Sequence, residues 1–337
     1  MIRKRTLYPT LMAVLLGGLV SCNPTATEGD KKAKEDKEAH NPATQVIPDE
    51  AKDLLGRWDL EVTQEGSVAP SWLEIKLSGY NTLVGAFVAQ SGSSRPVSHI
   101  LLQDGKFSFA IPPQWEEGTG DIVIEGKLEG RNLIGTIKGI DGAISNFKGS
   151  KAPYLKRTSP VTWGEPIALF NGKDLSGWKA SNEQNNWEVK DGILSNAKAG
   201  ANLITEQKFD DFKLQVEFKY PAGSNSGIYL RGRYELQIED SPKDQHPGPL
   251  YFGAIYGFLS PNEMAALGPN EWQTYDVTLV GRLVTVVANG KTIISNQEIP
   301  GITGGALDSK EGEPGPLYIQ GDHGPIEFRK ISITPAK

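Results

Sequence analysis

Short segments in which apolar and polar residues alternate run along most of the chain after residue 55. This alternation is typical of strands that bury one face, and segments with helical spacing of apolar residues are scarce. Between residues 55 and 152 the pattern predicts eight strands, at Gly56–Val62, Trp72–Leu77, Leu83–Val88, His99–Leu102, Lys106–Ile111, Asp121–Leu128, Leu133–Lys138 and Asn146–Lys151. Eight short antiparallel strands favour a small closed barrel, because closure leaves no strand edge unpaired.

The same pattern continues from about residue 160 to residue 335, after a proline-containing stretch. Asn289-Gly290 separates two of the segments and predicts a hairpin, because both turn positions favour positive φ. About a dozen antiparallel strands favour a two-sheet jelly roll. The predicted strands are Ile167–Phe170, Trp187–Val189, Ile193–Ser195, Phe212–Tyr220, Gly227–Leu230, Tyr234–Glu239, Gln273–Val280, Val284–Ala288, Thr292–Ser295, Pro316–Gln320 and Glu327–Ile333.

The first 22 residues do not show the alternating pattern of the later segments. Basic Arg3, Lys4 and Arg5 precede a short apolar run from Leu11 to Val20, and Cys22, the single cysteine of the chain, follows it after Ser21. This arrangement is typical of a secretory signal, since the apolar run is too short to cross about 30 Å of hydrocarbon. The Leu-Val-Ser-Cys ending resembles the lipobox of bacterial lipoproteins, which implies lipidation of Cys22 and anchoring to a membrane. An ordinary secretory signal with an incidental cysteine is the alternative.

These observations predict the organisation of the whole chain. Residues 1–22 form a lipoprotein signal peptide, and residues 23–50, which are polar and charged, form a disordered tether. An accessory barrel follows at 51–153, then a linker at 154–165 and a sandwich at 166–337. The net charge of −6 comes without a basic stripe, which argues against nucleic acid as a partner. We expect an envelope location, lipid-anchored at the outer membrane and facing the periplasm.

Alternation also sorts the polar residues of the second region by face. In Tyr234–Glu239, Glu235, Gln237 and Glu239 share the face opposite to the apolar residues, and Glu217 lies on the polar face of Phe212–Tyr220. A solvated outer face is the plain interpretation. Glu235 and Glu239 lie about 13 Å apart along a strand, at about 3.3 Å per residue, which is too far for the paired carboxylates of an ordinary glycosidase.

Seven blocks of residues in the second region resemble the 3-keto-disaccharide hydrolase family, also described as 3-keto-glycoside 1,2-lyases and 3-keto-2-hydroxyglucal hydratases. The blocks occur in order within residues 164 to 335, and the resemblance does not extend to the predicted barrel. They are Leu169–Trp178, Trp187–Leu194, Phe209–Leu214, Ser224–Glu235, Glu271–Asp276, Val286–Gly290 and Gln320–Arg329. The resemblance implies an all-β fold with a concanavalin A-like jelly-roll sandwich. In front of it, Gly56-x-Trp58 resembles the opening of a lipocalin-like barrel.

The resemblance also implies a chemistry. A partner glycoside 3-oxidoreductase oxidises the sugar at C3, and the ketone acidifies the proton on C2. A base removes this proton, the oxygen on C1 leaves by elimination, and water adds to the resulting glucal. The route needs a base, a group that stabilises the enolate and an acid.

The residue types suggest which side chains act as the base, as the group that stabilises the enolate and as the acid. Glu235 or His323 is the base, Arg231 or a divalent metal ion stabilises the enolate, and Asp322 or Glu217 orients the histidine or acts as the acid. Asn225, Gln237 and Gln320, with Glu217, would bind the sugar. The sequence establishes no cofactor, and the candidate ligands for a metal are Glu235, His323 and Glu217. Arg231 could instead simply pair with Glu235 or Glu217.

Two other functions stay open at this stage. One is a lectin-like lipoprotein that binds glycans without cleaving them, and the other is an ordinary glycoside hydrolase. The fold alone does not separate them from a lyase or hydratase.

Overall fold

The computed structural model describes residues 49–337, and all of them fall within one compact unit. The predictions for the signal peptide, for Cys22 and for the tether up to residue 48 lie outside the described residues. Helix α1 (Asp49–Leu54) begins at the last two residues of the segment predicted as a tether. Within the described residues, no helix combines the length and the apolar character needed to cross a bilayer.

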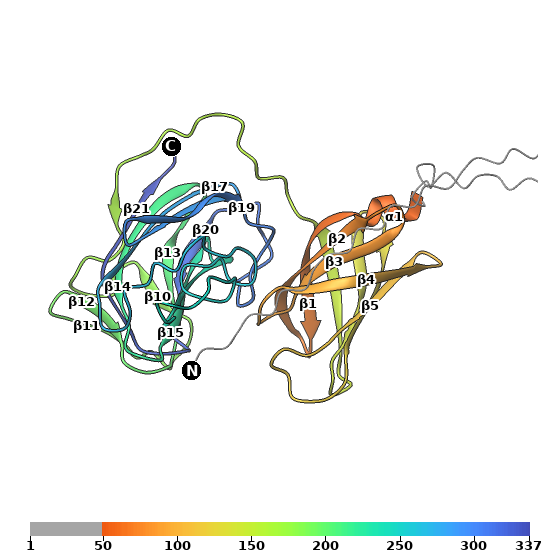
Figure 1. Ribbon diagram of the computed structural model, residues 1–337, viewed down its shortest axis with the longest axis horizontal. Coiled ribbons are helices and arrows are strands. Elements are labelled where there is room, and N and C mark those ends of the chain that lie inside the picture. The colour runs from red at the N-terminus through yellow and green to blue at the C-terminus, as the bar shows by residue number, and fades with distance from the viewer. Residues whose placement is uncertain (1–48) are drawn as a thin grey trace, which may run out of the picture. The chain divides into compact units, whose positions relative to one another are not determined.

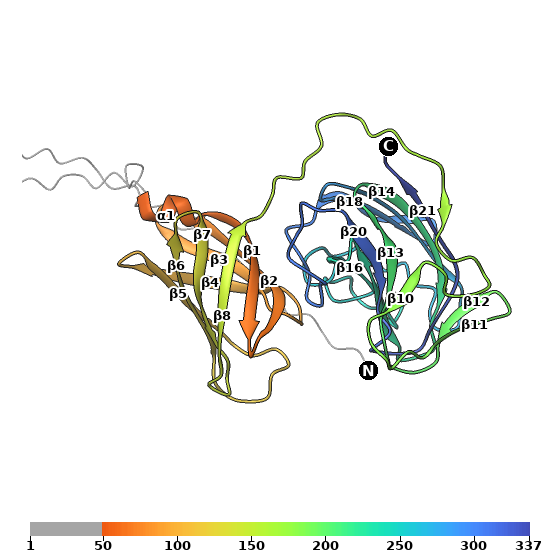
Figure 2. The same cartoon turned by 180° about the vertical axis from the view of Figure 1, so that it is seen from behind.

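The first part of the described chain is a closed eight-stranded barrel, shown in Figures 1 and 2. Its strands pair in sequence order, and β1 closes the barrel by pairing with both β2 and β8. The predicted eight strands and their closure are confirmed. The strands are β1 (Gly56–Gln64), β2 (Ser67–Ser78), β3 (Thr82–Val88), β4 (Arg95–Gln103), β5 (Lys106–Ile111), β6 (Ile122–Glu129), β7 (Asn132–Lys138) and β8 (Ile144–Lys151).

Helix α1 lies at one end of this barrel (Figure 1). Its apolar Ala51 and Leu54 join the barrel core, which also contains Trp58 and Phe107. The Trp58 indole N–H donates a 2.9 Å hydrogen bond to the Leu54 carbonyl, so the helix end and the first strand are fixed to each other. The sequence did not predict this helix, because a helix of fewer than two turns is too short to show the helical spacing of apolar residues.

Two sheets that share one hydrophobic core make up the second part, so the predicted two-sheet sandwich and the all-β class are confirmed. The five-stranded sheet has the order β10 (Trp178–Ala180), β13 (Leu203–Phe209), β20 (Gly315–Ile319), β15 (Asn225–Leu230), β16 (Tyr234–Glu239). The other sheet has the order β11 (Trp187–Lys190), β12 (Ile193–Asn196), β21 (Ile326–Pro335), β14 (Phe212–Lys219), β17 (Gln273–Val280), β18 (Leu283–Ala288), β19 (Lys291–Glu298), with β9 (Ile167–Ala168) on β21.

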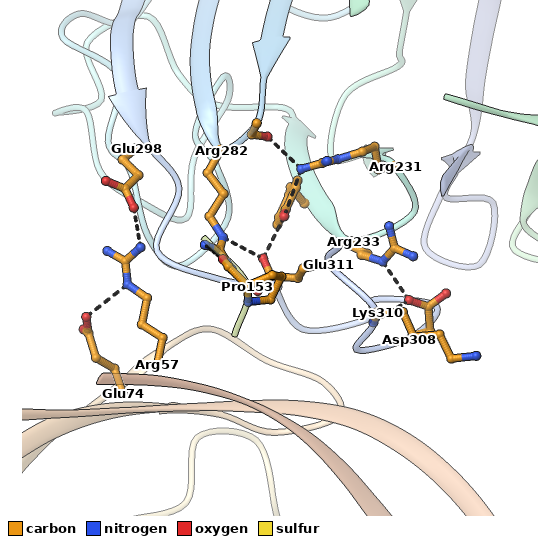
Figure 3. A network of polar contacts seen from close by, with 12 residues as sticks. Arg57, Glu74, Pro153, Arg231, Arg233, Arg282, Glu298, Asp308, Lys310 and Glu311 are labelled. Carbon is orange, nitrogen blue, oxygen red and sulfur yellow. Dashed lines mark hydrogen bonds and ion pairs between the residues drawn. The ribbon is translucent and has the colours of Figure 1, made fainter. Parts of the chain in front are cut away.

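The barrel packs directly on the sandwich. Trp72 and Val88 of the barrel are fully buried and belong to the sandwich core, and the Trp72 ring meets Phe258 edge-on with centroids 5.3 Å apart. Polar contacts continue the interface: Ser309 Oγ donates to the Leu60 carbonyl at 2.5 Å, and Arg57 joins Glu74 of the barrel to Glu298 of the sandwich (Figure 3). The barrel therefore contributes apolar surface to the core of its neighbour.

Candidate active site

One face of the five-stranded sheet carries several buried polar residues, among them Tyr229, Tyr318 and Glu235. Cross-strand pairing places Tyr229 of β15 beside Tyr318 of β20 on one side and beside Glu235 of β16 on the other. Paired residues point to the same face of a sheet, so these three side chains form a row. The two tyrosine rings stack with centroids 4.2 Å apart.

A second row of side chains lies on the same face, two residues further along these strands. Gln237 pairs with Gly227, and the backbone N–H of Gln320 donates to the Gly227 carbonyl at 2.9 Å. Both glutamine side chains are buried, and the Oε1 atom of each has no hydrogen-bond partner among the described residues. Buried amide oxygens without donors favour a ligand that supplies hydroxyl groups. Asn225 continues this face one position further along β15, opposite Glu239.

Glu235 lies at the β16 end of the first row. Only 4% of its surface is exposed, and this burial raises the pKa of its carboxyl group to about 8, against smaller lowering effects of the Tyr229 hydroxyl and of His323. The Tyr229 hydroxyl lies 2.9 Å from Glu235 Oε2 and 2.9 Å from the Gly304 carbonyl. A hydroxyl has one proton, so when Tyr229 donates to Gly304 it accepts from a protonated Glu235. The contacts therefore suit both protonation states of the carboxyl group.

Gly227 gives the carboxyl group its space. A Cβ atom on this glycine would lie 2.6 Å from Glu235 Oε1 and 2.9 Å from Glu235 Cγ, closer than real Cβ contacts allow. Glu235 Oε1 therefore lies over the glycine, between the two buried glutamines. The backbone of Glu235 is also fixed, because its N–H donates to Thr303 Oγ1 at 3.0 Å.

Asp322 and His323 form a pair beside this row, on the segment that follows β20. His323 Nδ1 lies 2.7 Å from Asp322 Oδ1, and both side chains are about half exposed. The hydrogen bond with Asp322 raises the pKa of His323, and the same bond lowers the pKa of Asp322. The charge of Glu235 also raises the pKa of His323. Asp322 and His323 therefore contact each other on the segment after β20, the strand that carries Tyr318 of the row with Glu235.

Three further residues near this group were not assigned from the sequence. Tyr256 lies on a loop that pairs with the edge of β16, where its N–H donates to the Glu235 carbonyl at 3.0 Å. Burial and then the charge of Glu235 raise the pKa of Tyr256. Asn202 donates to the Tyr318 hydroxyl at 2.9 Å and accepts from the Gly321 N–H at 2.7 Å. Strand alternation could have identified Tyr318, whereas Tyr256 and Asn202 lie outside the strands and show no such pattern.

The prediction for Arg231 is wrong. Arg231 lies in the turn between β15 and β16 with φ of 55°, and it is 1% exposed. Its guanidinium group contacts Asp210 at 3.1 Å, the Tyr234 hydroxyl at 3.2 Å and the Gly281 carbonyl at 2.7 Å. Figure 3 shows Arg231 in the same polar network as Arg282 and Glu311, so Arg231 has a structural role as an ion-pair partner.

The predictions for Glu217 are also wrong. Glu217 lies on β14 of the other sheet, where it accepts a 2.6 Å hydrogen bond from Arg329. It therefore does not join Glu235 and His323 as a sugar-binding residue, an acid or a metal ligand. Within residues 49–337, no group of three or more His, Cys, Asp or Glu is placed to hold a metal ion. The proposed metal site does not fit the residues present.

The fold and this site describe an all-β protein in which a closed barrel joins a two-sheet sandwich, with a buried acid and a His–Asp pair on one sheet face. The chain belongs to the family of the 3-keto-alpha-glucoside-1,2-lyase-like domain, whose sequence model matches residues 165–334, half of the chain.

Among similar proteins is one from Bacteroides thetaiotaomicron named 3-keto-disaccharide hydrolase, 29% identical over 125 residues. The match covers 33% of this chain and 43% of that protein, so the chain spans less than half of the relative's length. A crystal structure of a candidate glycosyl hydrolase from Parabacteroides distasonis is 30% identical, with a TM-score of 0.44, and covers 54% of this chain and 94% of that one. A second from the same organism is 21% identical, with a TM-score of 0.41, over 51% and 94% of the two chains.

Proposed function

We propose that the protein cleaves 3-keto-glycosides by elimination across C1 and C2, by hydration of the resulting 3-keto-2-hydroxyglucal, or by both steps. The observation that carries this proposal is the environment of Glu235. A buried carboxyl group with a pKa near 8 is a general base of suitable strength for a proton that an adjacent ketone has acidified. Membership of the 3-keto-glucoside lyase-like family supports the same substrate class.

In this proposal Glu235 acts as the base and His323 stabilises the enolate. Glu235 takes the proton from C2, and the electron pair of the C–H bond forms the enolate of the C3 ketone. His323, whose pKa Asp322 raises, carries a positive charge near this enolate and stabilises it. The enolate then expels the C1 oxygen, which takes a proton from His323 or from the newly protonated Glu235. Addition of water, with its oxygen to C1 and a proton to C2, gives the 3-keto sugar.

The second row of the site, which contains Gln237 and Gln320, positions the substrate. The unpartnered oxygens of Gln237 and Gln320 accept hydrogen bonds from sugar hydroxyl groups, and Asn225 adds a further polar contact on the same face. Buried acceptors of this kind discriminate strongly against ligands without the matching donors. This arrangement needs neither Arg231 nor a metal ion.

A single assay separates this function from its alternatives. A chromogenic glucoside and its 3-keto form are incubated with the protein, and release of the aglycone is followed. We expect release from the 3-keto form alone, and we expect Glu235→Gln to lower its rate by about 10²–10⁴-fold while the melting temperature stays within a few degrees. Glu239→Gln is the matched control, because Glu239 lies on the same strand and bonds Ser241.

Each alternative has its own outcome in this assay. Full activity of Glu235→Gln would overturn the role of Glu235. Release from the unoxidised glucoside would indicate an ordinary glycoside hydrolase, and binding without release would indicate a lectin-like module.

The proposal extends to the setting of the reaction. The 3-keto substrate must come from an enzyme that oxidises the C3 hydroxyl of a glycoside, so a glycoside 3-oxidoreductase is the functional partner. We further propose that lipid on Cys22 holds the protein at the outer membrane, facing the periplasm. Replacement of Cys22 by alanine should then move the protein from the membrane fraction to the soluble fraction, and an unchanged distribution would refute the anchor.

A further inference from the structure

A cavity of about 740 Å³ opens at one end of the barrel, and the reaction proposed above does not use it. Its wall includes Val62 and Gln64 at the end of β1, whereas α1 is bonded to Trp58 near the start of that strand. The cavity therefore lies at the end of the barrel remote from α1. Its volume is within the range of small-ligand sites, about 300–1,000 Å³.

Arg95 is the unusual residue in the wall of this cavity. Only 4% of it is exposed, and its Nη1 contacts Glu116 at 3.3 Å while the guanidinium group lies over the Phe87 ring. Its Nε and Nη2 atoms have no hydrogen-bond partner among the described residues. A buried cation with unused donors is costly, and a ligand with acceptor oxygens would remove that cost.

Trp115 supplies an aromatic surface to the same cavity. It is 61% exposed, although its segment is firmly held: the Gln114 and Trp115 N–H groups donate to Glu116 Oε2 at 2.8 and 3.2 Å. Gln114 also donates to Ser93 Oγ at 2.7 Å. An exposed tryptophan on a fixed segment offers a flat apolar platform at little entropic cost on binding.

The charges around the cavity restrict the class of ligand. The wall contains the carboxylates of Glu65, Glu116, Glu117 and Asp141, and the single guanidinium group of Arg95. This excess of negative charge repels anions such as phosphates and uronic acids. An aromatic platform with buried donors and several carboxylate acceptors instead matches a neutral polyhydroxylated ligand.

We propose that the open end of the barrel is a second carbohydrate-binding site, specific for neutral saccharides. Trp115 stacks on a sugar ring, and the free N–H groups of Arg95 donate to its hydroxyl or ring oxygens. The proposal concerns binding alone and does not depend on the reaction at Glu235.

The proposed saccharide site of the barrel lies next to the site that contains Glu235. Gln90 lines the cavity, and its carbonyl accepts a 2.8 Å hydrogen bond from the Gly305 N–H. The preceding carbonyl, of Gly304, is the one that accepts from Tyr229 in the row with Glu235. A saccharide held by the barrel thus lies near the sandwich site, where one of its units could react.

The test is calorimetric titration of the full chain with cellotetraose and with maltotetraose, which are neutral and unoxidised. We expect saturable binding of at least one of them, and we expect Trp115→Ala to weaken it about tenfold or more, as for an aromatic anchor. Tyr154→Ala is the matched control, because Tyr154 is 82% exposed and lies outside the cavity wall. Arg95→Met should also weaken binding, and its melting temperature shows whether it folds.

Glu235→Gln distinguishes this proposal from the proposed function, since it should leave the binding unchanged. Three results would overturn the second site: absence of binding to both saccharides, equal binding by Trp115→Ala and the unaltered protein, or tighter binding of an oligosaccharide of uronic acids than of either neutral one.

Discussion

The barrel–sandwich interface and the face of the five-stranded sheet both bury carboxyl groups, but they surround them differently. At the interface, Glu311 is fully buried and receives hydrogen bonds from Arg282 at 2.5 and 3.0 Å and from the Tyr234 hydroxyl at 2.7 Å (Figure 3). Burial opposes ionisation of Glu311, yet the bonds and charge of Arg282 hold its pKa below the ordinary value. Burial and the charge of Glu311 raise the pKa of the adjacent Asp59.

Glu235, at the sheet face, is similarly buried, but within residues 49–337 no guanidinium group contacts it, and its pKa is raised. The glutamines on either side of it keep unpartnered oxygens, whereas the acid at the interface is fully bonded to its neighbours. The comparison shows how burial can serve two purposes. A buried acid paired with a cation joins two parts of a fold, and a buried acid without one retains a proton that it can exchange near neutral pH.

The largest effect should follow removal of the cation at the interface. Arg282→Met leaves the charge of Glu311 buried without its partner, and we expect the free energy of unfolding to fall by about 3–5 kcal/mol, measured by urea denaturation. Lys291→Met is the control, because Lys291 and Glu263 form an exposed pair that should contribute about 1 kcal/mol or less. Equal effects of the two substitutions would show that the interface pair is no more important than a surface pair.

A smaller but still large effect should follow from filling the space over Gly227. The Cβ atom of Gly227→Ala would displace the Glu235 carboxyl group, and we expect kcat/KM on a 3-keto-glycoside to fall about 100-fold, as for a misplaced catalytic group. Gly312→Ala is the control, because its Cβ would first meet another atom at an ordinary 3.5 Å. Unchanged kcat/KM in Gly227→Ala would mean that the observed position of Glu235 is not the reactive one.

Strand alternation was the basis of most of the correct predictions from the sequence. The wrong predictions occurred where alternation gives no information. Alternation located the eight barrel strands and placed Glu235 and Gln237 among the candidates, because a period of two separates the faces of a strand. Alternation does not say which of two sheets a polar face belongs to, so Glu217 was placed with Glu235. Arg231 was misplaced because the chain turns at this residue, where alternation no longer applies. Strands β10 and β13 were missed because one is only three residues long and the other contains the polar run Glu206-Gln207-Lys208.

The raised pKa of Glu235 predicts the pH dependence of both activity and stability. As a base, Glu235 must be deprotonated, so kcat/KM should rise about tenfold per pH unit below about pH 8, and it should fall again at the higher pH at which His323 loses its proton. Between pH 4.5, its ordinary pKa, and about pH 8, the folded state holds a proton that the unfolded state has lost. The contribution of Glu235 to stability is therefore complete below pH 4.5 and declines as the pH rises through this window.

Urea denaturation at pH 5 and pH 8 checks the second part of this prediction. The difference in stability between the two pH values should be smaller in Glu235→Gln than in the unaltered protein. An equal difference in both proteins would show that Glu235 does not retain its proton on folding.

The smallest effect should come from the hydroxyl group of Tyr229. Its hydrogen bond lowers the pKa of Glu235, so Tyr229→Phe should raise that pKa further and move the rise in kcat/KM to higher pH. We expect a loss of about tenfold or less at pH 7, from one hydrogen bond to a group that ionises. Tyr318→Phe is the control, because its hydroxyl bonds Asn202 and its ring remains in the stack with Tyr229. A pH profile of Tyr229→Phe that matches this control would show that Tyr229 does not affect the ionisation of Glu235.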